Sequence, residues 1–287
     1  MKKFLRWLWI GIGFAFLLLI LCIASLGDGL LHLSYLDVGQ GDAILIRTPA
    51  MEYILIDGGP DGRVLQEIST VMPFYERTID LLVLSHPHAD HVDGLVEVLE
   101  RYDVGSVLLT GVSYRYPGYE RFLDLVTEKK VKIFFVNGEY DYRFGSLVFD
   151  IVYPLESLQG AHFENINNSS IAMRVLFGSH SFFFSGDLEL EGEAKIIKNG
   201  IDVRADVLKA GHHGSRTSNS EEILDLMRPS WAIVSCGVDN SFQHPHSETV
   251  RNLQKREVPL YRTDIDGRVD VVTDGYFLQF DALNRGS

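Results

Sequence analysis

The stretch Ser85-His86-Pro87-His88-Ala89-Asp90-His91 indicates what this 287-residue chain does, because it follows directly on the apolar run Ile79–Leu84. A continuous apolar run of this length predicts a strand that is buried on both faces. Three histidines and one aspartate within six positions then lie at the end of that strand. Imidazole and carboxylate groups are ligands for zinc, or for iron and manganese where oxygen ligands dominate.

The spacing of these four side chains favours two metal centres. His86 and His88 are two residues apart, so they share a face if the segment is extended. Asp90 and His91 follow where the chain turns toward a predicted helix over Leu95–Tyr102, and they can point to a second centre.

The rest of the chain predicts one α/β domain over residues 28–287, with no linker or repeat. Two strand-rich halves each end in helices, which indicates two sheets packed face to face with helices outside. The predicted strands are Leu31–Leu36, Ala43–Arg47, Tyr53–Ile56, Ile79–Leu84, Ser106–Leu109, Val131–Val136, Leu147–Tyr153, Ile171–Phe177, Ser181–Phe184, Val207–Lys209, Trp231–Ser235 and Phe277–Phe280, with Val271 in another. The predicted helices are Arg63–Val71, Leu95–Tyr102, Tyr119–Glu128, Glu189–Lys198, Glu221–Met227 and Ser247–Arg256.

Residues 1–27 predict a membrane segment. Lys2, Lys3 and Arg6 precede the uncharged run Trp7–Gly27, whose 21 residues would form a helix about 31 Å long, close to the ~30 Å apolar core of a bilayer. We expect a single-pass anchor with the body outside the cytoplasmic membrane, because basic residues stay inside. The small residues near the end of this run leave open a cleaved signal and a secreted product.

Composition excludes several classes of protein. The net charge of −13, from 26 basic and 39 acidic residues, argues against a broad basic face that grips duplex DNA. Contact with nucleic acid at a metal centre stays possible. Two cysteines, Cys22 and Cys236, exclude a disulfide scaffold or a four-cysteine zinc ribbon. We expect Cys236 to be a buried structural thiol.

The histidine-rich stretch resembles the HxHxDH signature of the metallo-β-lactamase superfamily. Asp57-Gly58-Gly59, Ser185-Gly186-Asp187 and Gly211-His212-His213-Gly214-Ser215 also match, in that order. The resemblance implies a four-layer αβ/βα sandwich with two metal ions at one edge. It implies these ligands: His86 and His88 for the first metal, Asp90 and His91 for the second, and Asp187 bridging the two.

Three further segments resemble the extracellular metal domain of ComEC, the DNA-uptake channel family, and also phosphorylcholine esterases. They are Leu36–Ala43, the pair His212-His213, and Gln243–His246. The glycine-rich part of the first segment is either a tight turn or a substrate-side loop. We expect His244 to face the site, although Pro245 and Ser247 also fit a helix start.

One departure from the superfamily concerns Asn165–Ser170, where most members carry a further histidine ligand. An amide oxygen is a harder ligand than imidazole, so the first metal would be held less tightly or would be manganese rather than zinc. His162 is a possible substitute, but a lone loop histidine is more often solvated.

The resemblance implies hydrolysis by hydroxide held between two divalent ions, Zn or Mn. We assign His213 as the last ligand of the second metal, and Asp90 and Asp187 to orient the hydroxide. On an extended segment, His212 would point elsewhere and donate to a phosphate oxygen, with Lys209 and Arg216 adding charge nearby.

Three functions compete. The first is a metal-dependent phosphodiesterase or nuclease, favoured by the ComEC-like segments. The second is a lactamase- or lactonase-type hydrolase of small cyclic substrates, which the asparagine run and the double histidine disfavour. The third is a non-catalytic binding domain, which the complete ligand set disfavours. No protein partner is inferred, and the true substrate, native metal and oligomeric state stay open.

Overall fold

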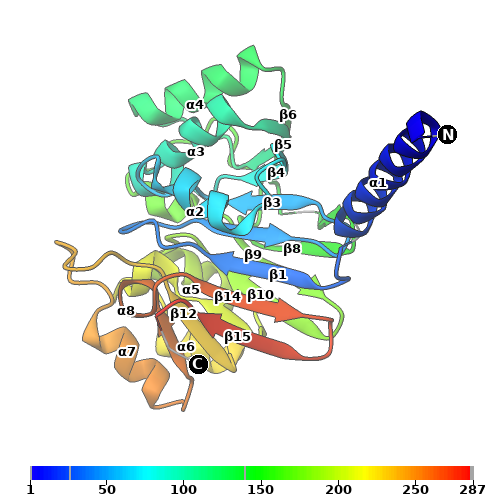
Figure 1. Cartoon of the computed structure of the whole chain (residues 1–287). Coiled ribbons are helices and arrows are strands. Elements are labelled where there is room, and N and C mark those ends of the chain that lie inside the picture. The colour runs from blue at the N-terminus through cyan, green and yellow to red at the C-terminus, as the bar shows by residue number, and fades with distance from the viewer. Residues whose placement is uncertain (1, 26, 139, 285–287) are drawn as a thin grey trace.

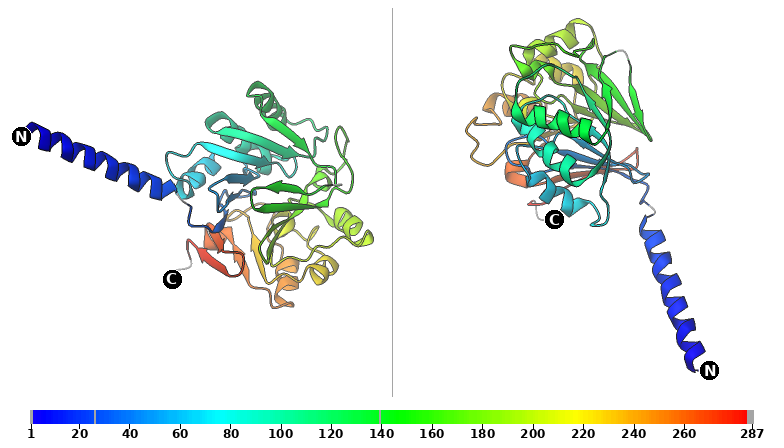
Figure 2. Two further views of the ribbon diagram at one scale, coloured as in Figure 1. Left: turned by 90° about the vertical axis from the view of Figure 1, so that its right-hand side faces the viewer. Right: turned by 90° about the horizontal axis from the view of Figure 1, so that it is seen from above.

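The computed structural model describes residues 2–25, 27–138 and 140–284. A long helix, α1 (Lys2–Ser25), projects from a body built on two sheets (Figures 1 and 2). Within the described parts of the chain, none of the helices combines the length and apolar composition that a membrane span requires. Residue 26, inside the predicted membrane segment, lies outside the described residues.

The first sheet contains eight strands, antiparallel over its first half and parallel from β3 to β6. In spatial order they are β15 (Leu278–Ala282), β14 (Val269–Thr273), β1 (Leu31–Tyr35), β2 (Ile44–Arg47), β3 (Tyr53–Ile56), β4 (Thr78–Val83), β5 (Asp103–Leu109) and β6 (Lys132–Phe135).

The second sheet contains seven strands, parallel from β13 to β10 and antiparallel beyond. In spatial order they are β13 (Leu260–Arg262), β12 (Trp231–Val234), β11 (Val207–Lys209), β10 (His180–Phe184), β9 (Ala172–Phe177), β8 (Leu147–Tyr153) and β7 (Tyr142–Phe144).

Helices cover the outer face of each sheet, which gives four layers. The first sheet packs against α2 (Arg63–Val71), α3 (Ala89–Arg101) and α4 (Pro117–Glu128). The second packs against α5 (Leu190–Lys198), α6 (Glu221–Met227) and α7 (Ser247–Gln254). Three short helical turns complete the body: η1 (Ile166–Ser169), η2 (Gly211–Gly214) and α8 (Thr263–Asp266). The predicted sandwich of two sheets with helices outside is confirmed.

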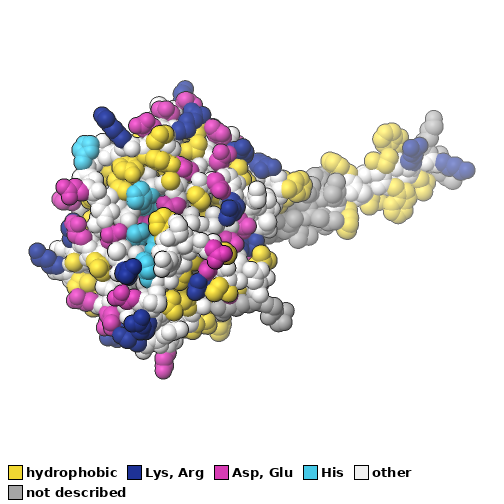
Figure 3. Space-filling model, turned by 90° about the vertical axis from the view of Figure 1, so that its left-hand side faces the viewer, with side chains coloured by type: hydrophobic (Ala, Val, Ile, Leu, Met, Phe, Trp, Pro, Cys, Tyr) yellow, Lys and Arg dark blue, Asp and Glu magenta, His cyan; other side chains and the backbone are white. Residues whose placement is uncertain are grey.

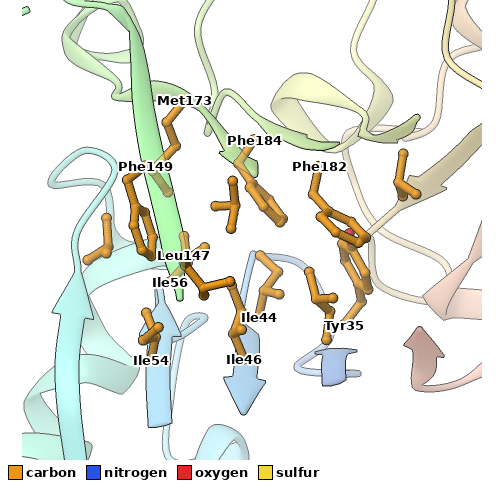
Figure 4. Close-up of a cluster of buried hydrophobic side chains, with 14 of the residues drawn as sticks. Tyr35, Ile44, Ile46, Ile54, Ile56, Leu147, Phe149, Met173, Phe182 and Phe184 are labelled. Atoms are coloured by element: carbon orange, nitrogen blue, oxygen red, sulfur yellow. The ribbon is translucent and has the colours of Figure 1, made fainter. Parts of the chain in front are cut away.

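The central core lies between the two sheets (Figure 4). Strand alternation explains why the central strands of the first sheet read as continuous apolar runs. In β2, Ile44 and Ile46 face the second sheet, whereas Leu45 faces the helices. Because both faces are covered, these strands are fixed in register, and the residues at their ends are held firmly.

Candidate metal centre

The histidine-rich stretch lies where β4 ends and α3 begins. The helix begins at Ala89, so the predicted start at Leu95 is too late by six residues. Asp90 and His91 therefore lie on its first turn, where the backbone N–H groups of His91 and Val92 donate to the carbonyl of His88. The first turn contains polar candidate ligands and lacks the apolar spacing by which a helix is recognised. The sequence pattern therefore did not indicate where the helix starts.

Asp187, which follows β10, lies between two groups of candidate ligands. One group is Asp90, His91, Asp187 and His213, and the other is His86, His88 and Asp187; within each, the ligand atoms lie within 4.8 Å of one another. The Nε2 atom of His91 is 3.3 Å from Oδ1 of Asp187, and the Nε2 atom of His213 is 3.5 Å from its Oδ2. The structure thus brings together the six side chains expected to bind metal.

Three atoms of this cluster are buried and lack a hydrogen-bond partner in the described part of the chain: His86 Nε2, His91 Nε2 and Asp187 Oδ1. Buried polar atoms are nearly always hydrogen bonded, so each orphan needs an explanation. Imidazole nitrogens and a carboxylate oxygen that converge in this way form the donor set that a divalent cation satisfies. The residues present therefore fit a pair of metal ions.

Neighbouring groups orient two of the histidines. Asp57 follows β3, and its Oδ2 atom lies 2.9 Å from Nδ1 of His91. Ser85 holds that carboxylate through its backbone N–H (2.8 Å) and its hydroxyl (2.6 Å). On the other side, His213 Nδ1 lies 3.0 Å from the carbonyl oxygen of Ser235. These partners turn both Nε2 atoms toward Asp187. The sequence motif Asp57-Gly58-Gly59 did not predict this role of Asp57, although its place at a strand end was a signal.

The prediction that Lys209 adds charge on the substrate side is wrong. It is buried, and its Nζ atom lies 2.7 Å from Oδ2 of Asp42. The other oxygen of Asp42 is 3.2 Å from Nδ1 of His213. Burial alone would raise the pKa of Asp42, but the charges of Lys209 and His213 lower it to about 2. The Asp42–Lys209 ion pair thus lies at Nδ1 of His213, whereas Nε2 of that ring faces Asp187. Arg216 is exposed.

The charges of the cluster shift its histidines in opposite directions. Burial alone would lower the pKa of His91, but the carboxylates of Asp187 and Asp57 raise it well above its usual value. Burial and the neighbouring charge of His91 lower the pKa of His86 well below its usual value. A neutral His86 has its lone pair free for a metal ion.

The prediction that the double histidine lies on an extended segment is wrong. It lies in η2, where His212 and His213 have φ values of 50° and 53°. In this left-handed conformation both rings reach Asp187, and His212 Nε2 is 3.6 Å from its Oδ2. His212 is 22% exposed and belongs to none of the ligand groups found among the described residues. Its Nδ1 atom is 3.1 Å from Thr217 Oγ1 and 3.3 Å from Glu189 Oε1.

His244 lies beside the cluster. Its buried ring is 5.4 Å from that of His212, and its Nδ1 atom is 3.4 Å from Nε2 of Gln40, in the glycine-rich loop. Burial and the charges of His213 and His212 lower its pKa to about 4.

The asparagine run that replaces the usual histidine holds Glu189. Side-chain amides of Asn165 and Asn167 donate to its two oxygens at 2.9 Å and 3.0 Å. Asn168 Oδ1 accepts from its backbone N–H at 3.2 Å. The run therefore fixes a carboxylate beside His212. His162 is exposed and is in none of the ligand groups of the described residues.

Histidine side chains gather near the middle of one face of the molecule, and α1 extends away from that face (Figure 3). Strand ends of two sheets that meet around a candidate pair of metal ions are typical of one superfamily of metal-dependent hydrolases. The model of the metallo-β-lactamase superfamily matches residues 36–238, and the chain belongs to that superfamily.

The chain is similar to several named competence and recombination proteins. ComE operon protein 3 of Bacillus subtilis is 29% identical, over 86% of this chain and 33% of its own length. Competence protein ComA of Neisseria gonorrhoeae is 29% identical, over 80% of this chain and 30% of its own. Recombination protein 2 of Haemophilus influenzae is 31% identical, over 82% of this chain and 28% of its own. The chain spans about a third of the length of these relatives, and they bear out the resemblance to the ComEC family.

Solved structures share the fold. CmlA, a diiron β-hydroxylase from Streptomyces venezuelae, has a TM-score of 0.54 at 19% identity, over 81% of this chain and 52% of its own. YhfI, a metallo-β-lactamase fold protein from Bacillus subtilis, has a TM-score of 0.51 at 12% identity, over 80% of this chain and 96% of its own.

Proposed function

We propose that this metal-dependent hydrolase of the metallo-β-lactamase superfamily is a phosphodiesterase or nuclease that uses two divalent ions, zinc or manganese. The observation that carries the proposal is the position of Asp187 between two ligand groups, where three buried ligand atoms have no hydrogen-bond partner among the described residues. The ComEC-like relatives favour a phosphodiester over an amide or a lactone.

His86 and His88 would hold one ion, Asp90, His91 and His213 would hold the other, and Asp187 would bridge them. When bound, such a pair lowers the pKa of water and neutralises charge that develops on a phosphoryl oxygen. The surrounding residues keep the ligands in place, since Asp57 and Ser235 fix the orientation of the two rings of the second group.

Two further groups act on the substrate in this proposal. The Thr217 hydroxyl donates to Nδ1 of His212 in this proposal, so the ring carries its proton on Nε2, which lies beside Asp187 and can donate to a phosphoryl oxygen. His244 packs against His212 and contacts the substrate from that side. Asp90 is partly exposed, so its carboxylate can also accept a hydrogen bond from the attacking water.

We also propose where the protein acts. The basic residues ahead of Trp7–Gly27 favour a body outside the cytoplasmic membrane, where a competence role would bring it to incoming DNA. Protease added to cells with a permeabilised outer layer should then degrade the body. Protection under those conditions would reverse the orientation, and a soluble product that begins near Ser25 would replace the anchor with a cleaved signal.

One assay tests the reaction. The protein is loaded separately with zinc and manganese and given bis-p-nitrophenyl phosphate, single-stranded DNA and nitrocefin. We expect turnover of the two phosphodiesters and its loss in Asp187→Asn. Turnover of nitrocefin alone would establish the small-substrate hydrolase, and no turnover with bound metal would favour a binding domain.

A further inference from the structure

Two series of aromatic rings extend from the metal centre to the surface, one from each ligand group. Outward from the first ligand group, the ring of His88 lies 6.0 Å from that of Tyr114, which lies 6.5 Å from that of Tyr116. Outward from the second, the ring of His213 lies 6.1 Å from that of His244, and Phe242 extends the series. The candidate ligands connect the two series, because the ring centroids of His86 and His91 are 4.2 Å apart.

The outer rings come from two loops on opposite halves of the sandwich. Tyr114 and Tyr116 lie between β5 and α4, and Phe242 lies between β12 and α7. Phe242 is 60% exposed, although it stacks on His244 with centroids 5.7 Å apart and planes at 22°. An exposed ring held flat against a buried one is fixed in orientation and still has a face available.

We propose that these two loops are base-stacking platforms, and that the metal centre takes an unpaired nucleic-acid strand with one base on Phe242 and another on Tyr114. This inference rests on the proposed phosphodiesterase function and names the substrate of that same site. The scissile phosphate then lies over the ligand groups, because the platforms flank them on both sides.

The charge of the protein fits a single strand better than a duplex. An acidic body with a net charge of −13 cannot supply the many phosphate contacts that duplex binding requires. Stacking needs no such charge and is open only to bases that are not already paired. Arg115, between the two tyrosines, and Arg216, whose backbone N–H donates to Nδ1 of His246 (3.0 Å), are exposed, so their guanidinium groups can contact a phosphate locally.

The test measures the preference for bases over a bare backbone. Binding of a labelled oligothymidylate, an abasic strand of equal length and a duplex is measured by fluorescence anisotropy at one salt concentration in a chelating buffer, and hydrolysis is measured with manganese. Wild-type protein should bind the oligothymidylate more tightly than the abasic strand, and Phe242→Leu should lower this ratio by about 5-fold to 150-fold, the range for one stacked base.

Two variants separate stacking from other effects. Phe242→Trp keeps a ring and should keep the preference. Phe277→Leu is the matched control: Phe277 is 77% exposed, but it lies in the β14–β15 turn, next to the start of β1 and far from the ligands. It should leave the preference unchanged. Tyr114→Leu should act like Phe242→Leu.

Each outcome decides one proposal. Equal binding of oligothymidylate and abasic strand, or equal binding of the duplex, overturns the stacking platforms even if both strands are cleaved. The stacking platforms are also overturned if Phe277→Leu lowers the binding ratio as much as Phe242→Leu does. If no strand is cleaved with either metal, the phosphodiesterase proposal fails, whereas the binding ratio still tests the platforms.

Discussion

Lys209→Met should cost about 3 kcal/mol of folding stability, because it leaves the Asp42 carboxylate buried without its main partner. The two side chains are 2% and 3% exposed, with 2.7 Å between Nζ and Oδ2. At an effective dielectric constant of about 20, two charges at this distance attract by about 6 kcal/mol. Removing one member of a buried pair typically costs about 3–5 kcal/mol. We expect the lower end because His213 also lies near Asp42.

The assay is urea unfolding of the metal-free protein, followed by far-ultraviolet circular dichroism and extrapolated to water. Lys195→Met is the matched control, since Lys195 pairs with Glu191 at 2.9 Å while 47% exposed. An exposed pair one helical turn apart is worth about 0.3–0.5 kcal/mol. The double variant Asp42→Asn with Lys209→Met should recover part of the loss, because no unpaired charge then stays buried.

A loss below about 1 kcal/mol in Lys209→Met would refute this reasoning, since it would equal that of an exposed pair. A double variant less stable than the sum of both single losses would also refute it, because the two losses would then not stem from a shared ion pair.

Further predictions concern the ligands and the buried thiol. Asp187→Ala should lose nearly all of about two bound metal ions by elemental analysis, and full content would contradict the bridging role. His213→Ala should lose metal and activity, whereas His212→Ala should keep metal and lose about 10²–10³ in kcat; the reverse pattern would exchange their roles. Burial and the charge of Asp264 raise the pKa of Cys236 to about 12. In a Cys22→Ser background, Ellman's reagent at pH 8 should therefore modify Cys236 only after denaturation, and rapid labelling of the native protein would contradict its burial.

Elements with a strong local signal could be predicted from the sequence. The bounds of α2, α6, β8 and β11 agree with the prediction, because their apolar spacing and flanking turn residues act locally. The strands β7 (Tyr142–Phe144) and β13 (Leu260–Arg262) were missed. Each has three residues, is partly exposed and lies at a sheet edge, so its conformation depends on a neighbouring strand rather than on its own pattern.

The same distinction applies to the site. The six expected ligands lie at strand ends, which a sheet brings to one edge, so their clustering follows from the order of motifs. The positions of the residues that contact and orient these ligands do not follow from the order of the motifs. Asp42 and Lys209 are 167 residues apart, and nothing in either local sequence shows that one will neutralise the other.

The geometry of the double histidine shows how tertiary contacts override a local expectation. A non-glycine residue in the left-handed region costs about 1–2 kcal/mol, so two in succession would not form in an isolated segment. Here Gly211 N–H donates to Asn219 Oδ1 at 2.8 Å, and the His213 ring is held at Ser235. Because these contacts impose the turn, both rings reach Asp187 instead of diverging as they would on a strand. The strain is therefore what places a candidate ligand and a candidate hydrogen-bond donor on the same carboxylate.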